Sequence, residues 1–343
     1  MPTFIIAEAG VNHNGDVGLA LRLIEIAAQC GADAVKFQTF SAEKLAAVGA
    51  QKAEYQQETT GDGDQLSMLK KLELTRDEFG RLKARCDALA IEFMSTAFDE
   101  ESLDFLVSIG IKRIKIPSGE ITNLPFIAHC ARKMMPIILS TGMSDLDEIE
   151  QAVACIRRAW KDIDFKTTDK EFLTILHCTS NYPAHPQDLN LTAMTTIAQK
   201  TGCPTGYSDH SQGIVVSPAA VALGASVIEK HYTLDKAMEG PDHKASLDQG
   251  ELSTMIRDIR IIEQALGTGE KKPSESELPV RDVARKSIAV ARDIPQGTVL
   301  SQSDLIMLRP GTGISPARRE EIVGRKTKSA LQSGALLDWK DIT

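Results

Sequence analysis

Short apolar runs alternate with longer amphipathic stretches over residues 4–266 of the chain. The runs are rich in β-branched residues and show little polar alternation, which is typical of parallel strands covered on both faces. The strands predicted from this pattern are Phe4–Ala9, Ala34–Thr39, Ile91–Ser95, Arg113–Ile116, Pro136–Ser140, Leu173–His177, Thr205–Ser208 and Ser226–His231.

Helical periodicity marks several of the stretches between these runs. Thr75 and Ser144 begin two of them, and acidic residues follow each one, so side-chain oxygens and negative charge lie at the exposed N–H groups of the helix start. The predicted helices are Gly18–Cys30, Thr75–Ala90, Glu100–Ile109, Ser144–Trp160, Pro218–Leu223 and Gly250–Leu266.

Strands and helices in this order and number predict an α/β fold, a (β/α)₈ TIM barrel. A doubly wound open sheet is the alternative, but no GxGxxG follows the first strand. Polar residues lie at or just after the carboxyl ends of different strands, and only a barrel brings those ends onto one face. These residues are Glu8, Lys36, Gln38, Lys115, Ser118, Ser140, His177, His210 and His231.

The character of the sequence changes near Lys271. Residues 271–284 are polar, charged and proline-containing, which predicts a linker between a catalytic domain at 1–270 and a module at 285–343. The module has short strand-like runs separated by turns, such as Leu305–Leu308. A β-rich unit of this size is marginal alone, so we expect it to pack on another surface.

Composition narrows the class of protein. The chain has 39 Lys and Arg against 47 Asp and Glu, a net charge of −8, which argues against nucleic-acid binding. No apolar run approaches the about 20 residues that span a bilayer, and the first run is too short for a signal peptide. Six scattered cysteines without a CxxC pair indicate reduced thiols in a cytoplasmic protein.

Lysines and hydroxyl groups at the strand ends suggest an anion pocket. Lys36 and Lys115 supply ammonium groups, and Ser118 and Ser140 supply hydroxyls near turns and a helix start. A phosphorylated substrate is favoured, although each lysine could instead form a Schiff base or pair with a carboxylate. ATP is disfavoured because no Walker motif is present.

A carboxylate and two histidines complete the candidate chemistry. Glu8 is a candidate general base or substrate orienter, or else a helix cap or ion-pair partner. His210 and His231 end adjacent strands, and Asp242 lies in the loop beyond, which suits an open catalytic metal site. The alternative is a pair of core histidines bonded to backbone.

Motifs along nearly the whole chain resemble the bacterial sialic acid synthase family, whose members make N-acetylneuraminate or legionaminate. They include FIIAEAGVNHNGD, GADAVKFQTF, KIPSGEITNLPF, IILSTGMS, HCTSNYP, GYSDHS, VIEKHYTLD and GPDHKASL, in this order. The segment RKSIAVARDIPQGTVLSQSDLIMLRPGTGISP is similar to the family's SAF domain, which is related to type III antifreeze proteins.

The resemblance implies condensation of phosphoenolpyruvate with an open-chain N-acetylated hexosamine, with loss of phosphate by C–O cleavage. The sugar would be N-acetylmannosamine, or alternatively 2,4-diacetamido-2,4,6-trideoxymannose. A divalent metal, Mn²⁺ or alternatively Mg²⁺ or Co²⁺, would bind His210 and His231. The implied phosphoenolpyruvate ligands are Lys36, Thr96, Lys115, Ser118, Ser140 and Tyr182.

The resemblance also assigns the sugar site. Gln38, Glu120 and Asp242 would orient the sugar, and Glu8 would handle the proton at the new centre and the attacking water. Arg309 would reach the N-acetyl group on the partner subunit of a domain-swapped homodimer. Some relatives carry Asn where this chain has Ser180, so either Ser180 or the adjacent Asn181 would lie near the phosphate.

Two other functions remain as alternatives. A lysine Schiff-base aldolase would use the same barrel, and would be trapped by borohydride in the presence of pyruvate. A non-enzymatic protein would use the C-terminal module to bind ice or carbohydrate above an inert barrel. The retained Glu8, Lys36, His210 and His231 argue against an inert barrel.

Overall fold

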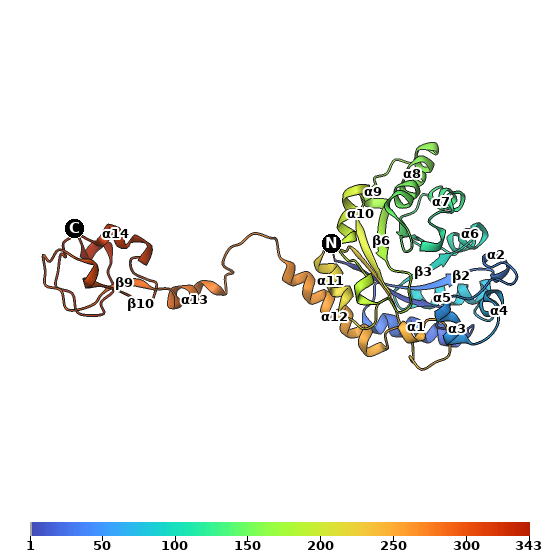
Figure 1. The fold of residues 1–343 in the computed structure, drawn as a ribbon, viewed down its shortest axis with the longest axis horizontal. Coiled ribbons are helices and arrows are strands. Elements are labelled where there is room, and N and C mark those ends of the chain that lie inside the picture. The colour runs from blue at the N-terminus through green and yellow to red at the C-terminus, as the bar shows by residue number, and fades with distance from the viewer. Residues whose placement is uncertain (1) are drawn as a thin grey trace. The chain divides into compact units, whose positions relative to one another are not determined.

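The computed structural model describes residues 2–343, which form two compact units that divide after Gly267 (Figure 1). In the first unit, eight parallel strands close into a barrel in chain order, and the last strand pairs with the first. The TIM barrel is confirmed and the open sheet is wrong. The strands are β1 (Phe4–Gly10), β2 (Ala34–Thr39), β3 (Glu92–Ala97), β4 (Ile114–Ile116), β5 (Ile137–Ser140), β6 (Leu173–Cys178), β7 (Thr205–Asp209) and β8 (Val227–His231).

Helices surround these strands (Figure 1). Those expected from the sequence are α1 (Val17–Cys30), α5 (Arg76–Ala88), α6 (Glu100–Ser108), α8 (Leu146–Asp162), α11 (Val216–Ala222) and α12 (Gln249–Leu266). The sequence pattern missed α7 (Leu124–Ala131), α9 (Asp169–Phe172) and α10 (Ala193–Thr201).

The inside of the barrel has an apolar layer followed by a polar one. Ile6, Ala34, Met94, Ile138, Leu176 and Val227 form a buried cluster. Side chains along a strand repeat their direction every two residues, so the residues two places further on face the same interior. They are Glu8, Lys36, Thr96, Ser140, Cys178 and Glu229.

The opposite faces of the strands pack against the helices in one large core that includes Ile5, Val35 and Phe37. Helix α1 shows how the sequence places such a helix. Asp16 caps its start by accepting a hydrogen bond from Gly18 N at 2.6 Å. On the side that faces the barrel, Ala20, Leu23, Ile24 and Ala27 are fully buried.

A long insertion follows β2, at the carboxyl end of the barrel. It contains α2 (Ala42–Leu45), α3 (Glu54–Thr60) and α4 (Gln65–Lys70), none of which the sequence pattern predicted. A small apolar cluster of Val11, Phe40, Met68 and Leu72 joins α4 to the segments that follow β1 and β2. The insertion is therefore anchored at the same end of the barrel as the polar layer.

The second unit is a small β-rich domain. It contains β9 (Ser287–Val290) and β10 (Leu305–Leu308), which pair antiparallel, and a short helix α14 (Arg319–Ile322). Its core includes Ile288, Ile294 and Leu337. Residues 277–284, interpreted from the sequence as part of the linker, form helix α13 (Glu277–Ala284), whose side chains are largely exposed.

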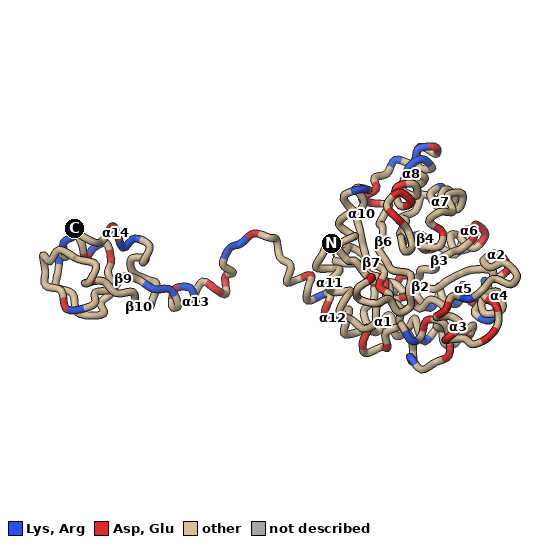
Figure 2. Tube along the Cα trace, in the orientation of Figure 1, with Lys and Arg blue, Asp and Glu red and all other residues tan. Residues whose placement is uncertain are grey.

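Basic side chains are interspersed with acidic ones along the helices of the barrel (Figure 2). Acidic residues outnumber basic ones over the whole chain, which gives the net charge of −8. Within residues 2–343, no helix combines the length and the apolar character needed to cross a bilayer.

Candidate functional site

The polar layer and the loops above it line a cavity of about 430 Å³ at the carboxyl ends of the strands. Most of the residues singled out from the sequence line this one cavity. They are Glu8, Lys36, Gln38, Thr96, Lys115, Ser118, Ser140, Ser180, Tyr182, His210, His231 and Asp242.

Four of the sequence-derived residues lie elsewhere. His177 is outside the cavity lining, and its Nε2 lies 2.7 Å from the Leu189 carbonyl oxygen. Glu120 is outside the cavity lining, and its carboxylate accepts a hydrogen bond from Asn123 Nδ2 at 2.7 Å. Asn181 is exposed, so it is Ser180 of this adjacent pair that faces the cavity. Arg309 is an exposed residue of the second unit.

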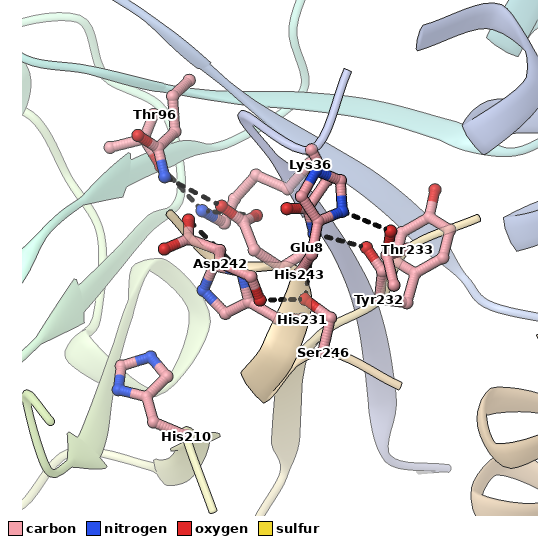
Figure 3. Close-up of polar contacts among 12 residues, drawn as sticks. Glu8, Lys36, Thr96, His210, His231, Tyr232, Thr233, Asp242, His243 and Ser246 are labelled. Carbon is pink, nitrogen blue, oxygen red and sulfur yellow. Dashed lines mark hydrogen bonds and ion pairs between the residues drawn. The ribbon is translucent and has the colours of Figure 1, made fainter. Parts of the chain in front are cut away.

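Two lysines and two carboxylates form a buried cluster at the base of the cavity. Lys36 Nζ lies 2.7 Å from Glu8 Oε2 and 3.7 Å from Glu229 Oε2, and Lys115 Nζ lies 3.5 Å from Glu229 Oε1. None of the four side chains is more than 5% exposed. Thr96 accepts a hydrogen bond from Lys36 Nζ at 2.8 Å, which fixes that ammonium group (Figure 3).

The two carboxylates have opposite pKa shifts. Burial raises the pKa of Glu8 to about 7 in spite of the nearby Lys36. For Glu229, Lys115 and Lys36 outweigh the effect of burial and lower the pKa to about 2. At neutral pH, Glu229 is therefore a fixed anion, while Glu8 can exchange a proton, and such separated pKa values are typical of an acid–base site.

Hydroxyl groups gather beside the lysines. Ser118 Oγ accepts a hydrogen bond from the Gly142 N–H at 2.8 Å, and a Cβ atom at Gly142 would lie only 2.2 Å from Ser180 Oγ. The buried Ser140 Oγ has no hydrogen-bond partner among the described residues. A buried polar group without a partner needs an explanation, and a bound anion would provide one.

The two histidines approach each other from adjacent strands, with ring centroids 5.6 Å apart. His210 Nδ1 donates to the Thr179 carbonyl at 2.7 Å, so its lone pair is on Nε2, which lies 3.4 Å from Ser208 Oγ. His231 Nδ1 has no hydrogen-bond partner among the described residues and lies 4.0 Å from Asp242 Oδ2. Burial lowers the pKa of His210 to about 4 and that of His231 well below its usual range, so both rings are neutral.

This donor set fits a divalent cation. Neutral imidazoles are the form that binds metal, and the unpartnered Nδ1 of His231 is available. Within residues 2–343 no three His, Cys, Asp or Glu side chains are grouped so that they could hold a metal ion together. A cation bound by the two imidazoles would therefore keep coordination positions open, as catalytic sites do.

Aromatic and polar neighbours hold these groups in place. The ring of Tyr182 lies 4.1 Å from that of His210, centroid to centroid. Asn12, in the turn after β1, donates to Ser246 Oγ at 2.9 Å, and Ser246 Oγ donates to the Asp242 carbonyl at 2.7 Å. The turn after β1 therefore supports the loop that carries Asp242.

Reasoning from the sequence missed several cavity residues. Glu229 is the most important, because it contacts both lysines. It lies two residues before His231 in β8, so the two-residue period of the strand could have assigned both to the same face. Cys178 and Ser208 also line the cavity, and Ser208 donates to Glu229 Oε1 at 3.0 Å.

Family models and similar proteins of known name all point to one family. The NeuB family model matches residues 23–271 and the SAF domain model matches residues 285–343. The N,N'-diacetyllegionaminic acid synthase of Legionella pneumophila is 50% identical over 100% of this chain and 95% of its own. That of Campylobacter jejuni is 48% identical over 94% of this chain and 95% of its own.

A crystal structure of N-acetylneuraminic acid (sialic acid) synthetase from Leptospira borgpetersenii, in complex with citrate, is similar over 82% of this chain and 90% of that chain. It is 36% identical, with a TM-score of 0.70. The sequence motifs, the closed barrel and these matches agree, and the chain belongs to the NeuB family, with a SAF domain at its carboxyl end.

Proposed function

We propose that the cavity condenses phosphoenolpyruvate with an open-chain N-acetylated hexosamine to give a nonulosonic acid and phosphate. One observation carries this proposal. A buried cluster of two ammonium groups lies in the same cavity as two neutral imidazoles and Asp242. One part of the cavity suits an anionic phosphate ester, and the other suits a carbonyl oxygen bound to a metal.

Phosphoenolpyruvate would bind at the lysines. With Glu8 protonated, Lys36, Lys115 and Glu229 together carry one net positive charge, two ammonium groups less one carboxylate. The unpartnered hydroxyl of Ser140 would add a hydrogen bond, and Thr96 holds Lys36 in position. Neutralising the anion in a buried site is the main electrostatic contribution of these residues.

The bond changes follow from the chemistry of an enol ester. The π electrons of phosphoenolpyruvate form a bond from its C3 to the aldehyde carbon, and the aldehyde oxygen becomes a hydroxyl. Water adds to the electron-poor C2, and the C2–O bond to phosphate then breaks to leave a ketone. Holding both reactants in position can contribute about 7–11 kcal/mol to the lowering of the barrier.

Glu8 would transfer protons, and Glu229 would stabilise positive charge. Glu8, with a pKa of about 7, can give a proton to the new hydroxyl and accept one from the attacking water. Glu229 stays ionised and would stabilise positive charge at C2. No lysine needs to form a Schiff base.

His210 and His231 would hold the divalent cation, and Asp242 beside them would orient the sugar. When bound, Mn²⁺, or alternatively Mg²⁺ or Co²⁺, would polarise the aldehyde oxygen as a Lewis acid. The Thr179 carbonyl fixes the ring of His210 so that its Nε2 is the ligand atom.

The sugar is one of two amino sugars. N-acetylmannosamine follows from the family resemblance alone. The relatives of 50% and 48% identity are both N,N'-diacetyllegionaminic acid synthases, which favours 2,4-diacetamido-2,4,6-trideoxymannose as the second candidate.

The second unit would complete the site as part of a domain-swapped homodimer. We infer a barrel at 1–270, a linking segment at 271–284 and the SAF domain at 285–343. The division after Gly267 and the matched range of the SAF model support these boundaries. Arg309, which is exposed, would reach the sugar bound to the partner subunit.

Release of phosphate tests the proposal directly. The full-length protein is mixed with phosphoenolpyruvate and each sugar, with Mn²⁺ and with EDTA. Release that needs a sugar and stops with EDTA is expected. No release with either sugar in the presence of Mn²⁺, or borohydride trapping of the protein with pyruvate, would overturn it.

A further inference from the structure

Helix α4 presents one continuous face to the catalytic cavity. Gln65, Met68 and Leu69 are spaced i, i+3 and i+4, the spacing of residues on one side of a helix, and Leu72 lies in the turn that follows Lys70, the last residue of the helix. All four line the cavity. Three of the four are apolar. We call these four residues the α4 wall.

The α4 wall is fixed to the barrel. Asp64 caps the helix by accepting a hydrogen bond from Ser67 N at 2.8 Å. Gly15, with φ of +77°, lies so close to the end of the helix that a Cβ there would be 2.3 Å from the Lys71 carbonyl oxygen. Met68 and Leu72 also pack on Val11 and Phe40. The wall therefore presents a defined surface.

The α4 wall lies where the far end of a sugar would be. The lysine cluster takes the phosphate ester, and His210, His231 and Asp242 take the aldehyde end. The rest of the lining comes mainly from the insertion, together with Val11 and Phe98, which add to its apolar side. Carbons 4 to 6 of an open-chain hexosamine would extend into this region.

Apolar atoms favour a methyl group over a hydroxymethyl group. Burial of a methyl against Met68 or Leu69 is favourable, whereas a hydroxyl packed on these two side chains loses its water and receives no hydrogen bond from them. Gln65 adds one amide to the same face, which suits the amide of a second acetamido group. An amide beside apolar atoms matches the 4-acetamido, 6-deoxy end of 2,4-diacetamido-2,4,6-trideoxymannose.

We propose that the α4 wall is the specificity determinant for the far end of the sugar, and that it selects a 6-deoxy sugar with a second acylamino group over one that ends in hydroxyls. This inference rests on the proposed condensation. Apolar surfaces discriminate a methyl from its hydroxylated counterpart by about 10–100-fold. The protein should show a preference of that size in kcat/KM.

Three consecutive positions provide the test. Met68→Gln and Leu69→Gln make the wall polar. Lys70→Gln is a matched control because Lys70 is exposed and does not line the cavity. kcat/KM is measured for both sugars with each full-length variant. Each wall variant should lower the preference at least about tenfold through the KM for the sugar. The KM for phosphoenolpyruvate should stay the same in the wall variants, and Lys70→Gln should keep the wild-type preference between the two sugars.

The outcomes separate the two proposals. If no sugar releases phosphate, the proposed condensation fails. If both sugars react but the ratio is the same in the wild type, Met68→Gln and Leu69→Gln, or shifts equally in Lys70→Gln, the α4 wall does not set specificity. Leu69 is only half-buried, so Leu69→Gln decides the question if Met68→Gln does not fold.

Discussion

Neighbouring residues of β8 belong to two buried ion networks on opposite sides of the barrel wall. Glu229 faces the cavity and contacts Lys36 and Lys115. Lys230 faces outward and lies 3.1 Å from Asp209, both side chains being fully buried. Both networks pair lysine ammonium groups with carboxylates, and their side chains are buried to almost the same degree. They can therefore be compared directly.

The outer network is complete. Asp209 accepts hydrogen bonds from Ser211 N at 2.9 Å and from Ser217 Oγ at 2.7 Å, and Lys230 also donates to the Ser211 carbonyl. Among the residues described, the inner site keeps two buried polar atoms without hydrogen-bond partners, Ser140 Oγ and His231 Nδ1. A buried ion pair with all its hydrogen bonds made has a structural role, whereas a buried polar atom without a partner indicates a place for a ligand.

The largest effect expected from this comparison is on stability. Lys230→Met leaves the buried carboxylate of Asp209 without its cation, and removing one partner of such a pair costs about 3–5 kcal/mol. Denaturant unfolding measures the loss. The double variant Asp209→Asn/Lys230→Met should regain part of it because the unpaired charge is gone. A single variant as stable as the wild type would contradict the structural role of the pair.

The matched change in the inner network should affect activity. Lys36→Met should lower kcat/KM for phosphoenolpyruvate by at least about 10²–10³-fold, the scale of losing one electrostatic contact to the reacting group. Its free energy of unfolding should change far less than that of Lys230→Met, because Glu8 can take up a proton at neutral pH. Steady-state kinetics and denaturant unfolding measure both. Full activity in Lys36→Met would remove the lysine cluster from the mechanism.

Loss of one imidazole should weaken metal binding. His231→Ala removes one of two nitrogen ligands, so it should lower the affinity for Mn²⁺ at least about 100-fold. Isothermal titration calorimetry of the folded variant measures it without relying on turnover. An unchanged affinity would exclude His231 as a ligand.

The pKa of Glu8 predicts a pH dependence. Its value is raised from about 4.5 to about 7 on folding, so between these pH values the folded state holds a proton that the unfolded state has lost. The contribution of Glu8 to stability is therefore present below about pH 4.5 and is lost as the pH rises to 7. The stability of the wild type relative to Glu8→Gln should fall over this range, as denaturant unfolding at several pH values would show. A difference that stays constant would mean that Glu8 is ionised throughout.

The smallest effect concerns the second unit. Arg309→Ala should raise the KM for the sugar about tenfold, with little change for phosphoenolpyruvate, because one charge-assisted contact is lost. Mixing Arg309→Ala with Lys36→Met subunits should restore activity, because in a swapped dimer one cavity would again have both residues. If the mixture is no more active than the sum of its parts, Arg309 does not act across subunits.

The sequence predicted the strands and therefore the barrel, because fully covered strands are continuous apolar runs. It missed α10, whose Thr195 and Thr196 are poor helix formers, and the insertion helices, which are too short to show periodicity. Most cavity residues could be found because they end strands. Glu229 escaped because, beside Lys230, it resembles half of an ordinary ion pair, although the alternation of a strand already places the two on opposite sides.

The fate of the bridging oxygen of phosphoenolpyruvate tests the central claim most directly. The substrate is labelled with ¹⁸O between C2 and phosphorus, and the products with 2,4-diacetamido-2,4,6-trideoxymannose and Mn²⁺ are analysed by mass spectrometry. The label should appear in the inorganic phosphate, beside an unlabelled nonulosonic acid, because the C–O bond breaks. Label retained in the sugar acid, or no sugar acid formed, would contradict condensation in this cavity.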